Sequence, residues 1–219
     1  MSIKVTVEIL NIGDELLLGI RTNSHLTYLG KQLSLLGLKI DYCQVVPDKA
    51  DSIQSAFKIA TERSDIVIAT GGLGPTEDDL TRESLATLLG RELIYNESIF
   101  DLIKDRFLKL GRNVSEVHKK QCFQIEGSQI LKNDRGTAPG LFVVHNACKI
   151  FLLPGPTHEL IPMFEKQILS YVKNKVCAEA DSSYIQLRTC GIGESTVEEV
   201  VSPIIKQYES IEIAFCVHL

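Results

Sequence analysis

A glycine-rich segment in the middle of the chain has the residue types that bind phosphorylated ligands. It reads Gly71-Gly-Leu-Gly-Pro-Thr-Glu-Asp-Asp79 and follows the apolar run 65–70. Glycines let main-chain N–H groups turn toward a ligand, and the positive end of a following helix points the same way. The segment lacks the Gly-Lys-Ser/Thr of a P-loop, and Glu77 stands where the dinucleotide-binding pattern Gly-x-Gly-x-x-Gly needs glycine. The glycines predict an anion site, with a tight strand-to-helix turn as the structural alternative.

Acidic residues stand beside this predicted anion site. Asp78 and Asp79 end the glycine-rich segment, and Asp14 and Glu15 follow the first predicted strand. Carboxylates repel a phosphate unless a divalent cation lies between them. The repulsion is avoided if a metal ion bridges the acids to a diphosphate, or if one carboxylate accepts paired hydrogen bonds from the amidine-like edge of a base or pterin. The structural alternative is that one of the aspartates, Asp78 or Asp79, caps the next helix.

Further polar residues are candidates for contacts with phosphate, ribose or metal. Thr137 and the neighbouring N–H groups could hold a second phosphate or a ribose, and Glu194 could add a carboxylate from the C-terminal region. Four cations near the motifs could neutralise phosphate oxygens, and they are Arg82, Lys119, Lys120 and Arg135. The five histidines show no ligand spacing and are expected to be structural, and no nucleophile elbow is present in the sequence.

Strands that alternate with helices must position these residues. Helical stripes separate three apolar runs, which lie at 4–11, 38–46 and 65–70. This order is typical of parallel β-α-β units, so residues 1 to about 170 are predicted to fold as a doubly wound, mostly parallel α/β sheet. Ligands of such sheets bind beyond the carboxyl ends of the strands, where the loops at 13–15, 71–79 and 154–156 are expected to meet.

The second half of the chain predicts a hairpin, another helix and a small C-terminal unit. The hairpin pairs 141–144 with 149–153, and a helix starting at Thr157 or Pro162 follows it. Residues 178–183 are the predicted linker between a domain at 1–177 and a small β-α-β unit at 184–219. The elements expected in that α+β unit are a strand at 184–188, a helix at 194–207 and a strand at 211–217.

Composition narrows the class of protein. The chain has 219 residues, 44% of them hydrophobic, which suffices for one large domain without a disulfide or metal staple. Because the formal charge is −5, we expect no nucleic-acid partner. The six scattered cysteines form neither a zinc pattern nor a disulfide framework, which favours a cytoplasmic location. No apolar run is long enough for a membrane span, so we expect no membrane contact and no targeting segment.

Several segments together resemble the N-terminal domain of the CinA family, which belongs to the molybdopterin-binding-like superfamily. The most specific is Thr70-Gly-Gly-Leu-Gly-Pro-Thr-Glu-Asp-Asp-Leu-Thr-Arg82. The others are Gly13-Asp14-Glu15-Leu16-Leu17-x-Gly19, Thr22-Asn23, Lys120-Gln121, Asn133 with Gly136-Thr137-Ala138-Pro139-Gly140, Leu153-Pro154-Gly155 and Gly191-Ile192-Gly193-Glu194-Ser195. The resemblance spans nearly the whole chain and implies a molybdopterin-binding-like α/β fold.

The resemblance implies an enzyme that hydrolyses a nucleotide diphosphate with the help of a divalent metal ion. The implied reaction converts ADP-ribose to AMP and ribose 5-phosphate with Mg²⁺, Mn²⁺ or Co²⁺, and K⁺ as a further cation. Asp78, Asp79 and Lys120 would be catalytic, and the two aspartates would hold the metal. The implied substrate-binding residues are Gly13, Asp14, Thr70, Gly71, Gly72, Gly74, Asn133, Gly136, Thr137, Pro154, Gly155 and Glu194.

Two other classes of function stay open. One is a molybdopterin-binding or adenylyl-transferring protein of cofactor biosynthesis, and the other is a noncatalytic nucleotide-binding domain. The sequence departs from the family at Pro154-Gly-Pro-Thr-His158, where Pro-Gly-x-Pro-x-Glu is usual, so that the acid falls at Glu159. The family continues past the segment 211–219 and often carries an amidase domain, so a truncated or shortened member is expected. Its expected partners are a nucleotide substrate and a second copy in a homodimer.

Overall fold

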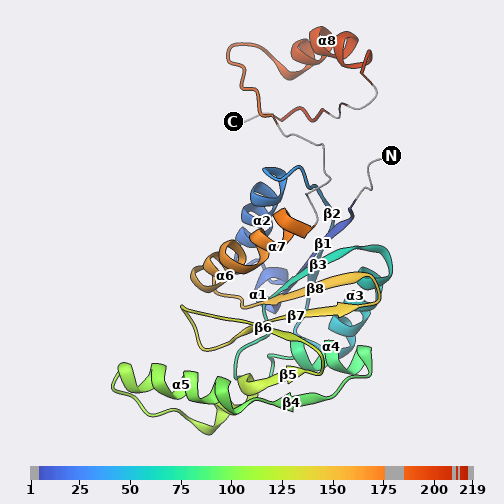
Figure 1. The fold of residues 1–219 in the computed structure, drawn as a ribbon. Coiled ribbons are helices and arrows are strands. Elements are labelled where there is room, and N and C mark those ends of the chain that lie inside the picture. The colour runs from blue at the N-terminus through green and yellow to red at the C-terminus, as the bar shows by residue number, and fades with distance from the viewer. Residues whose placement is uncertain (1–4, 176–184, 209–210, 212, 217–219) are drawn as a thin grey trace. The chain divides into compact units, whose positions relative to one another are not determined.

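The computed structural model describes residues 5–175, 185–208, 211 and 213–216 (Figure 1). The chain divides into two compact units, residues 1–184 and 185–219. The predicted linker at 178–183 lies outside the described residues. Among the helices that the structure describes, none is long and apolar enough to cross a membrane.

A six-stranded sheet forms the centre of the first unit, in the order β2-β1-β3-β8-β7-β6 (Figure 1). The four parallel strands are β1 (Val7–Ile12), β2 (Ile40–Val46), β3 (Ile66–Thr70) and β8 (Cys148–Leu153). β7 (Gly140–His145) pairs antiparallel with β8 and with β6 (Gln129–Leu131). Every residue of β1 and β3 is buried, as expected for central strands covered on both faces. The prediction of a mostly parallel α/β sheet with a hairpin is therefore confirmed.

Helices cover both faces of this sheet. On one face, Ile53 and Phe57 of α3 (Ala50–Arg63) and Leu85 of α4 (Thr81–Leu89) pack in one core cluster with β1 and β3. On the other face, Leu29 of α2 (Ser24–Ser34) and Leu160 of α6 (Thr157–Met163) belong to a second cluster. The sheet thus lies between two apolar layers, and its loops are held at the two edges.

Local signals fix the ends of α2. The side chain of Asn23 accepts a 3.1 Å hydrogen bond from the amide of Leu26, which satisfies a donor in the first turn. After the helix, Gly37 has φ of 73°, the left-handed conformation that glycine adopts without strain. The start of α2 lies next to the carboxyl end of β3, because His25 Nδ1 is 3.2 Å from the hydroxyl of Thr70.

The helix after β8 begins at Thr157, and Pro162 lies inside it. Of the two predicted starts, the earlier one is therefore correct. Proline has no N–H to donate to the preceding turn, and the chain continues as a π-helical segment, η2 (Phe164–Leu169), before α7 (Ser170–Lys175).

A smaller lobe inserts between α4 and β6. The strands β4 (Leu93–Tyr95) and β5 (Phe123–Ile125) form a two-stranded antiparallel sheet, and they flank α5 (Glu97–Lys109) and the 3₁₀ helix η1 (Glu116–Cys122). Ile99, Ile103 and Cys122 form its own small apolar cluster. Figure 1 shows α5, β4 and β5 of this lobe at the bottom.

The second unit contains one regular element among its described residues, α8 (Glu194–Ile205), and α8 buries no side chain. Strands were predicted at 184–188 and 211–217, but residues 185–188 and 213–216 are not in strands. The remaining positions of both predicted strands lie outside the described residues. An apolar alternating pattern forms a strand only where a partner strand satisfies its backbone groups, and the described residues of this unit offer none.

Candidate functional site

The carboxyl ends of the parallel strands bring the predicted loops to one edge of the sheet. The amide of Gly71 after β3 donates to the carbonyl of Leu153, 3.0 Å away, at the end of β8. Gly155 lies against Gly71, because a Cβ placed on Gly155 would be 3.6 Å from the Gly71 Cα. On the other side, Gly71 approaches the carbonyl of Ile12 at the end of β1 so closely that a Cβ would overlap it. The glycine loop (residues 71–79) is thus central to the edge, as predicted.

Three successive main-chain amides of the glycine loop are free. Within the part of the chain that the structure describes, the N–H groups of Gly72, Leu73 and Gly74 donate to no acceptor. They lie between β3 and the N-terminus of α4, a nine-residue helix whose positive end faces the same loop. Unpaired amides at such a junction attract a phosphate or carboxylate.

Close packing also requires these glycines. This agrees with the alternative interpretation of the sequence, a tight strand-to-helix turn. Gly71 and Gly72 have φ of 100° and 65°, in the region that favours glycine. A Cβ on Gly72 would overlap the hydroxyl of Thr81, whose Oγ1 donates to the Gly71 carbonyl at 2.8 Å. The glycine residues are thus explained by packing, and the anion-binding character of the loop rests on its free amides.

Asp78 and Asp79 are held by Thr76 and do not cap α4. The Thr76 hydroxyl lies 2.5 Å from Asp78 Oδ1 and from Asp79 Oδ2, and the Thr76 amide donates to Asp79 Oδ2 at 2.9 Å. The residue before α4 is Leu80, and no side chain caps that helix. The helix-cap alternative for the two aspartates is therefore wrong. Hydrogen bonds from the Thr76 hydroxyl and from the backbone amide of Asp78, together with the positive charge of Lys120, lower the pKa of Asp78. This exposed carboxyl is therefore ionised at neutral pH.

Two further acids lie at the ends of β1 and β2. Asp48 follows β2, and its Oδ2 accepts a 2.8 Å hydrogen bond from the amide of Asp14, the first residue of α1 (Asp14–Leu17). Burial raises the pKa of Asp48, and the negative charges of Asp14, Glu15 and Asp78 raise it further. These mutually repelling acids form an acidic rim beside the glycine loop, made up of Asp14, Glu15, Asp48 and Asp78. An anionic ligand there needs a cation or a proton.

Lys120 contacts the backbone of the glycine loop. Its ammonium group donates to the carbonyl of Thr76 and lies 3.5 Å from the carbonyl of Glu77. This position places Lys120 beside the predicted acids, as the sequence suggested. Its contacts are those of a group that holds the loop, and its predicted catalytic role stays a prediction.

The predicted residues of the 133–140 segment gather around another acid at the same edge. Asn133 donates to Glu159 Oε2 at 2.6 Å and accepts from the amide of Gly136 at 2.7 Å. Gly136 lies so close to Glu159 that a Cβ would overlap the carboxylate. Thr137 follows in the same partly exposed loop. Asn133 and Gly136 in the loop between β6 and β7 thus surround Glu159 of α6, and the contact of Asn133, Gly136 and Thr137 with a ligand stays a prediction.

No complete metal site is preformed in the described part of the molecule. Within those residues, no group of three or more His, Cys, Asp or Glu side chains converges to hold an ion. Asp78 and Asp79 share one hydroxyl partner, so they could supply two carboxylates at most. Glu194 is the exposed first residue of α8 in the second unit. Its predicted part in the site stays a prediction.

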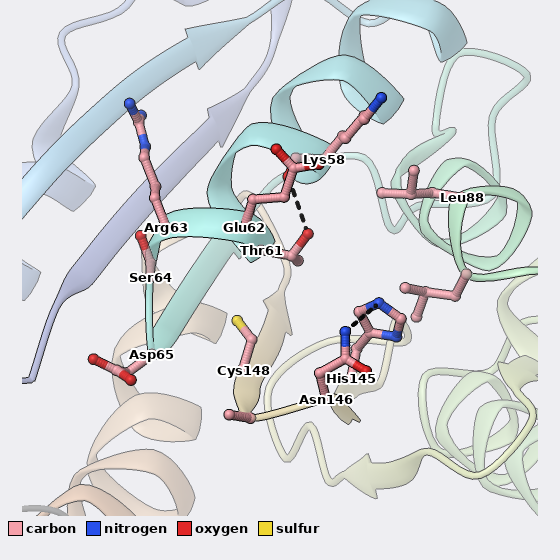
Figure 2. Close-up of a pocket in the computed structure, with 12 residues that line it drawn as sticks. Lys58, Thr61, Glu62, Arg63, Ser64, Asp65, Leu88, His145, Asn146 and Cys148 are labelled. Carbon is pink, nitrogen blue, oxygen red and sulfur yellow. Dashed lines mark hydrogen bonds between the residues drawn. The ribbon is translucent and has the colours of Figure 1, made fainter.

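A cavity of about 700 Å³ lies at the opposite edge of the sheet, where α3 ends and the β7–β8 turn begins (Figure 2). Figure 2 shows Lys58 and Glu62 on one side and His145 and Asn146 on the other, with the Cys148 thiol between them. Burial raises the pKa of Cys148 to about 12, so its thiol is not a nucleophile at neutral pH. None of the motif residues lines this cavity. The candidate site is therefore the edge of the sheet that carries the loops after β1, β3 and β8, called the loop edge below.

Three residues of this edge were not predicted from the sequence to belong to the site: Asp48, Thr76 and His25. Asp48 directly follows a parallel strand, so the rule that placed the other loops at the edge would have found it. Thr76 lies within the glycine-rich segment but offers no signal of its own. His25 was expected to be structural, yet its ring lies 3.2 Å from the Thr70 hydroxyl at the end of β3.

Comparison with known families and proteins shows what the chain is similar to. The family described as "Probable molybdopterin binding domain" matches residues 8–174. A CinA-like protein of Dictyoglomus turgidum is 42% identical over 207 residues, which are 94% of this chain and 50% of that protein. The chain thus spans about half the length of the curated relatives it matches.

Solved structures show the same likeness. The crystal structure of the protein CinA from Thermoplasma acidophilum matches with a TM-score of 0.69 and 31% identity, over 75% of this chain and 96% of that one. The molybdopterin biosynthesis enzyme MoaB of Thermus thermophilus matches with a TM-score of 0.50 and 19% identity, over 78% of this chain and 98% of that one. At that identity, the second match supports the fold alone.

Proposed function

The chain belongs to the CinA family, with residues 8–174 in the family of probable molybdopterin binding domains, and on this premise we propose that the loop edge binds a phosphorylated heterocyclic compound, a nucleotide or a pterin. The free amides of Gly72, Leu73 and Gly74 carry this proposal. Free backbone amides of a glycine loop that precedes a helix recognise phosphate without reference to the rest of the ligand. The heterocycle is then recognised by other groups of the edge.

The acidic rim favours a particular form of ligand. Asp78 is ionised and exposed, and Asp48 lies among acids that raise its pKa. A diphosphate beside these groups needs a counter-cation, whereas a base or pterin can offer paired N–H donors to one carboxylate. Both arrangements use the amides for phosphate, and they differ in what the carboxylates do.

The second candidate function is hydrolysis of a diphosphate bond, with ADP-ribose as the substrate. The observation that favours it is the position of Asp78 and Asp79, two carboxylates on one hydroxyl directly after the free amides. Water would add its oxygen to one phosphorus as the bridging P–O bond breaks. The products are AMP and ribose 5-phosphate, and the protons of the water pass to phosphate oxygens or to solvent.

Two carboxylates fit the way in which Mg²⁺ binds in proteins. Mg²⁺ usually takes one or two carboxylates and completes its coordination with substrate phosphates and water, so a preformed cluster of three acids is not required. Asp78 and Asp79 are the residues that would hold such an ion. Bound there, a divalent ion would offset the charge of the diphosphate and polarise it. The amides would orient the phosphate, and Lys120 would hold the loop through the Thr76 carbonyl.

Binding is tested with a ligand that cannot be hydrolysed. We expect the methylene analogue of ADP-ribose, in which CH₂ replaces the bridging oxygen, to bind in calorimetric titrations with Mg²⁺ present. Adenosine, which lacks phosphate, should bind at least about tenfold more weakly, a difference of about 1.4 kcal/mol. A pterin phosphate measured alongside separates the two ligand classes. Equal affinity for adenosine and the analogue, or no binding of any of the phosphorylated compounds, would contradict the proposal.

Hydrolysis is tested separately by incubation of the purified chain with ADP-ribose and Mg²⁺, Mn²⁺ or Co²⁺. We expect AMP and ribose 5-phosphate in equal amounts, and none when a chelator is added. Binding of the analogue without any turnover of ADP-ribose would leave the chain as a nucleotide-binding domain and reject the second candidate.

A further inference from the structure

A row of hydrogen-bonded polar side chains crosses the loop edge from β1 to α6. Asn11, fully buried at the end of β1, accepts a 3.3 Å hydrogen bond from the hydroxyl of Thr70 at the end of β3. Thr70 Oγ1 lies 3.2 Å from His25 Nδ1, and His25 Nε2 lies 3.4 Å from the hydroxyl of Thr157. These four residues come from four different elements, and among them only Thr70 was expected from the sequence to bind substrate.

His25 lies where the glycine loop meets the turn after β8. It is the second residue of α2, and the backbone of Gly155 is among the groups that act on the pKa of its imidazole. Gly155 in turn packs against Gly71, the residue that directly precedes the free amides. The ring therefore lies between Thr70, which directly precedes the glycine loop, and Thr157, the first residue of α6.

The charge of this imidazole is sensitive to its surroundings. Burial lowers the pKa of His25 below its usual 6.5, and the backbone of Gly155 and the charge of Glu15 on α1 offset part of that effect. β3 presents the uncharged Thr70. From α6, Thr157 contacts the ring, while the titratable His158 lies 3.7 Å from Glu159. The ring is thus neutral near pH 7 in the free protein, with Glu15 as the acid whose charge acts on it.

Resting on the proposed function, we infer that His25 is a positioning residue of the phosphate site that takes up a proton from solvent when an anionic ligand binds. A phosphate on the amides of the glycine loop adds negative charge beside the ring and favours the imidazolium. The protonated ring donates from both nitrogens, so the hydroxyls of Thr70 and Thr157 accept from it. Thr70 then keeps its own proton on Asn11 Oδ1, and Thr157 turns its proton away from the ring. His25 thereby converts ligand charge into a fixed orientation of two hydroxyls at the edge.

The test measures affinity against pH with a ligand that does not itself titrate. The methylene analogue of ADP-ribose has two phosphorus groups that each carry one acidic oxygen and stay ionised from pH 6 to pH 8. We expect its affinity in Mg²⁺ to rise several-fold as the pH falls from 8 to 6. A change of one pKa unit in the ring upon binding gives at most about tenfold. Calorimetric titrations in two buffers of different ionisation enthalpy should show net proton uptake in the same range.

Variants separate His25 from the neighbouring acids. In His25→Gln, which keeps a polar group but cannot become charged, affinity should change less than about twofold between pH 8 and pH 6. His25→Asn, which keeps a group near Thr70, should behave in the same way if the glutamine variant does not fold. His145→Gln, a matched change at the opposite edge, should retain the wild-type pH profile.

The outcomes distinguish the inference from the proposed function. If the wild type binds the analogue with no dependence on pH, or if His25→Gln keeps the full dependence, the inference is wrong and the proposed site stands. In the latter case the titrating group is an acid such as Asp48. If no phosphorylated ligand binds at any pH, the proposed function is wrong, and the inference that rests on it is overturned as well.

Discussion

The guanidinium of Arg82 donates a 2.6 Å hydrogen bond to the backbone carbonyl of Lys120. Arg82 is 1% exposed, and it also donates to the carbonyl of Leu73 in the glycine loop at 3.3 Å. Lys120 in turn reaches back to the carbonyl of Thr76. Two cations thus join the glycine loop to η1: Arg82 donates to carbonyls of both segments, and Lys120 of η1 donates to the loop. These contacts hold the lobe in place relative to the candidate site.

Replacement of Arg82 by methionine should destabilise the protein. The buried carbonyl of Leu73 and the partly buried carbonyl of Lys120 would lose their donor, which costs about 2–4 kcal/mol of the free energy of unfolding. Urea unfolding followed by circular dichroism measures this change. The matched change at an exposed arginine, Arg112→Met, should stay within about 0.5 kcal/mol. Equal stability of the two variants would show that Arg82 does not hold the loop.

Gly72 is expected to be intolerant of any side chain. Its φ of 65° and the nearby hydroxyl of Thr81 predict that Gly72→Ala lowers the free energy of unfolding by about 2 kcal/mol or more. Thr81→Ala removes the overlapping hydroxyl, so the double variant should cost less than the sum of the two single changes. Strict additivity in this double-mutant cycle would contradict the packing account.

The buried carboxylate of Glu8 predicts a loss of stability in acid. Burial raises its pKa, but hydrogen bonds from Arg63, Gln44 and Ser64 and the charge of Arg63 lower it by more, so the net pKa lies below 4.5. A carboxyl whose pKa is depressed in the folded state stabilises the protein fully above its unfolded pKa, and this stability is lost as the pH falls through the folded pKa. We therefore expect the free energy of unfolding to decrease as the pH is lowered below about 4.5.

The variant Glu8→Gln isolates this contribution. It should be less stable than the wild type at pH 7, because Arg63 loses its ion pair at 2.6 Å, and the difference should shrink between pH 5 and pH 3. Thermal unfolding over that range measures both trends. A constant difference at every pH would mean that ionisation of Glu8 does not contribute.

The sequence allowed much of the fold to be predicted because its signals are local. The continuous apolar runs of β1 and β3, the cap at Asn23 and the glycine at 37 each act within a few residues. The rule for parallel sheets then placed the loops at one edge without any knowledge of distances. Prediction failed at 185–188, where an apolar pattern found no partner strand in the described residues.

The candidate site was predictable only in part, because its contacts join distant segments. His25 and Thr157 are 132 positions apart, and neither lies in a pattern that marks a ligand. The Thr76 contacts, in contrast, are local, yet a sequence cannot show that one hydroxyl holds two aspartates. Residue types therefore indicated phosphate chemistry, while the partners of each group required the structure.

Asp78 distinguishes the two possible roles of the acidic rim. If it bridges a cation to the diphosphate, Asp78→Asn should bind the methylene analogue of ADP-ribose more tightly without metal, because a repelling charge is gone, and should lose the gain that Mg²⁺ gives the wild type. Metal-dependent release of AMP from ADP-ribose should fall at least about tenfold, or about 1.4 kcal/mol in barrier height. Thermal stability should change little, because the side chain is exposed and asparagine still accepts from Thr76.

Glu77→Gln is the matched control for this prediction. It removes the same charge from the neighbouring exposed position of the loop, so it should reproduce the loss of general repulsion but retain the Mg²⁺ dependence and most of the turnover. If Asp78→Asn instead weakens binding equally with and without metal, the carboxylate recognises the base or pterin. If both variants behave like the wild type, the acidic rim takes no part in ligand binding, and the free amides of the glycine loop alone define the site.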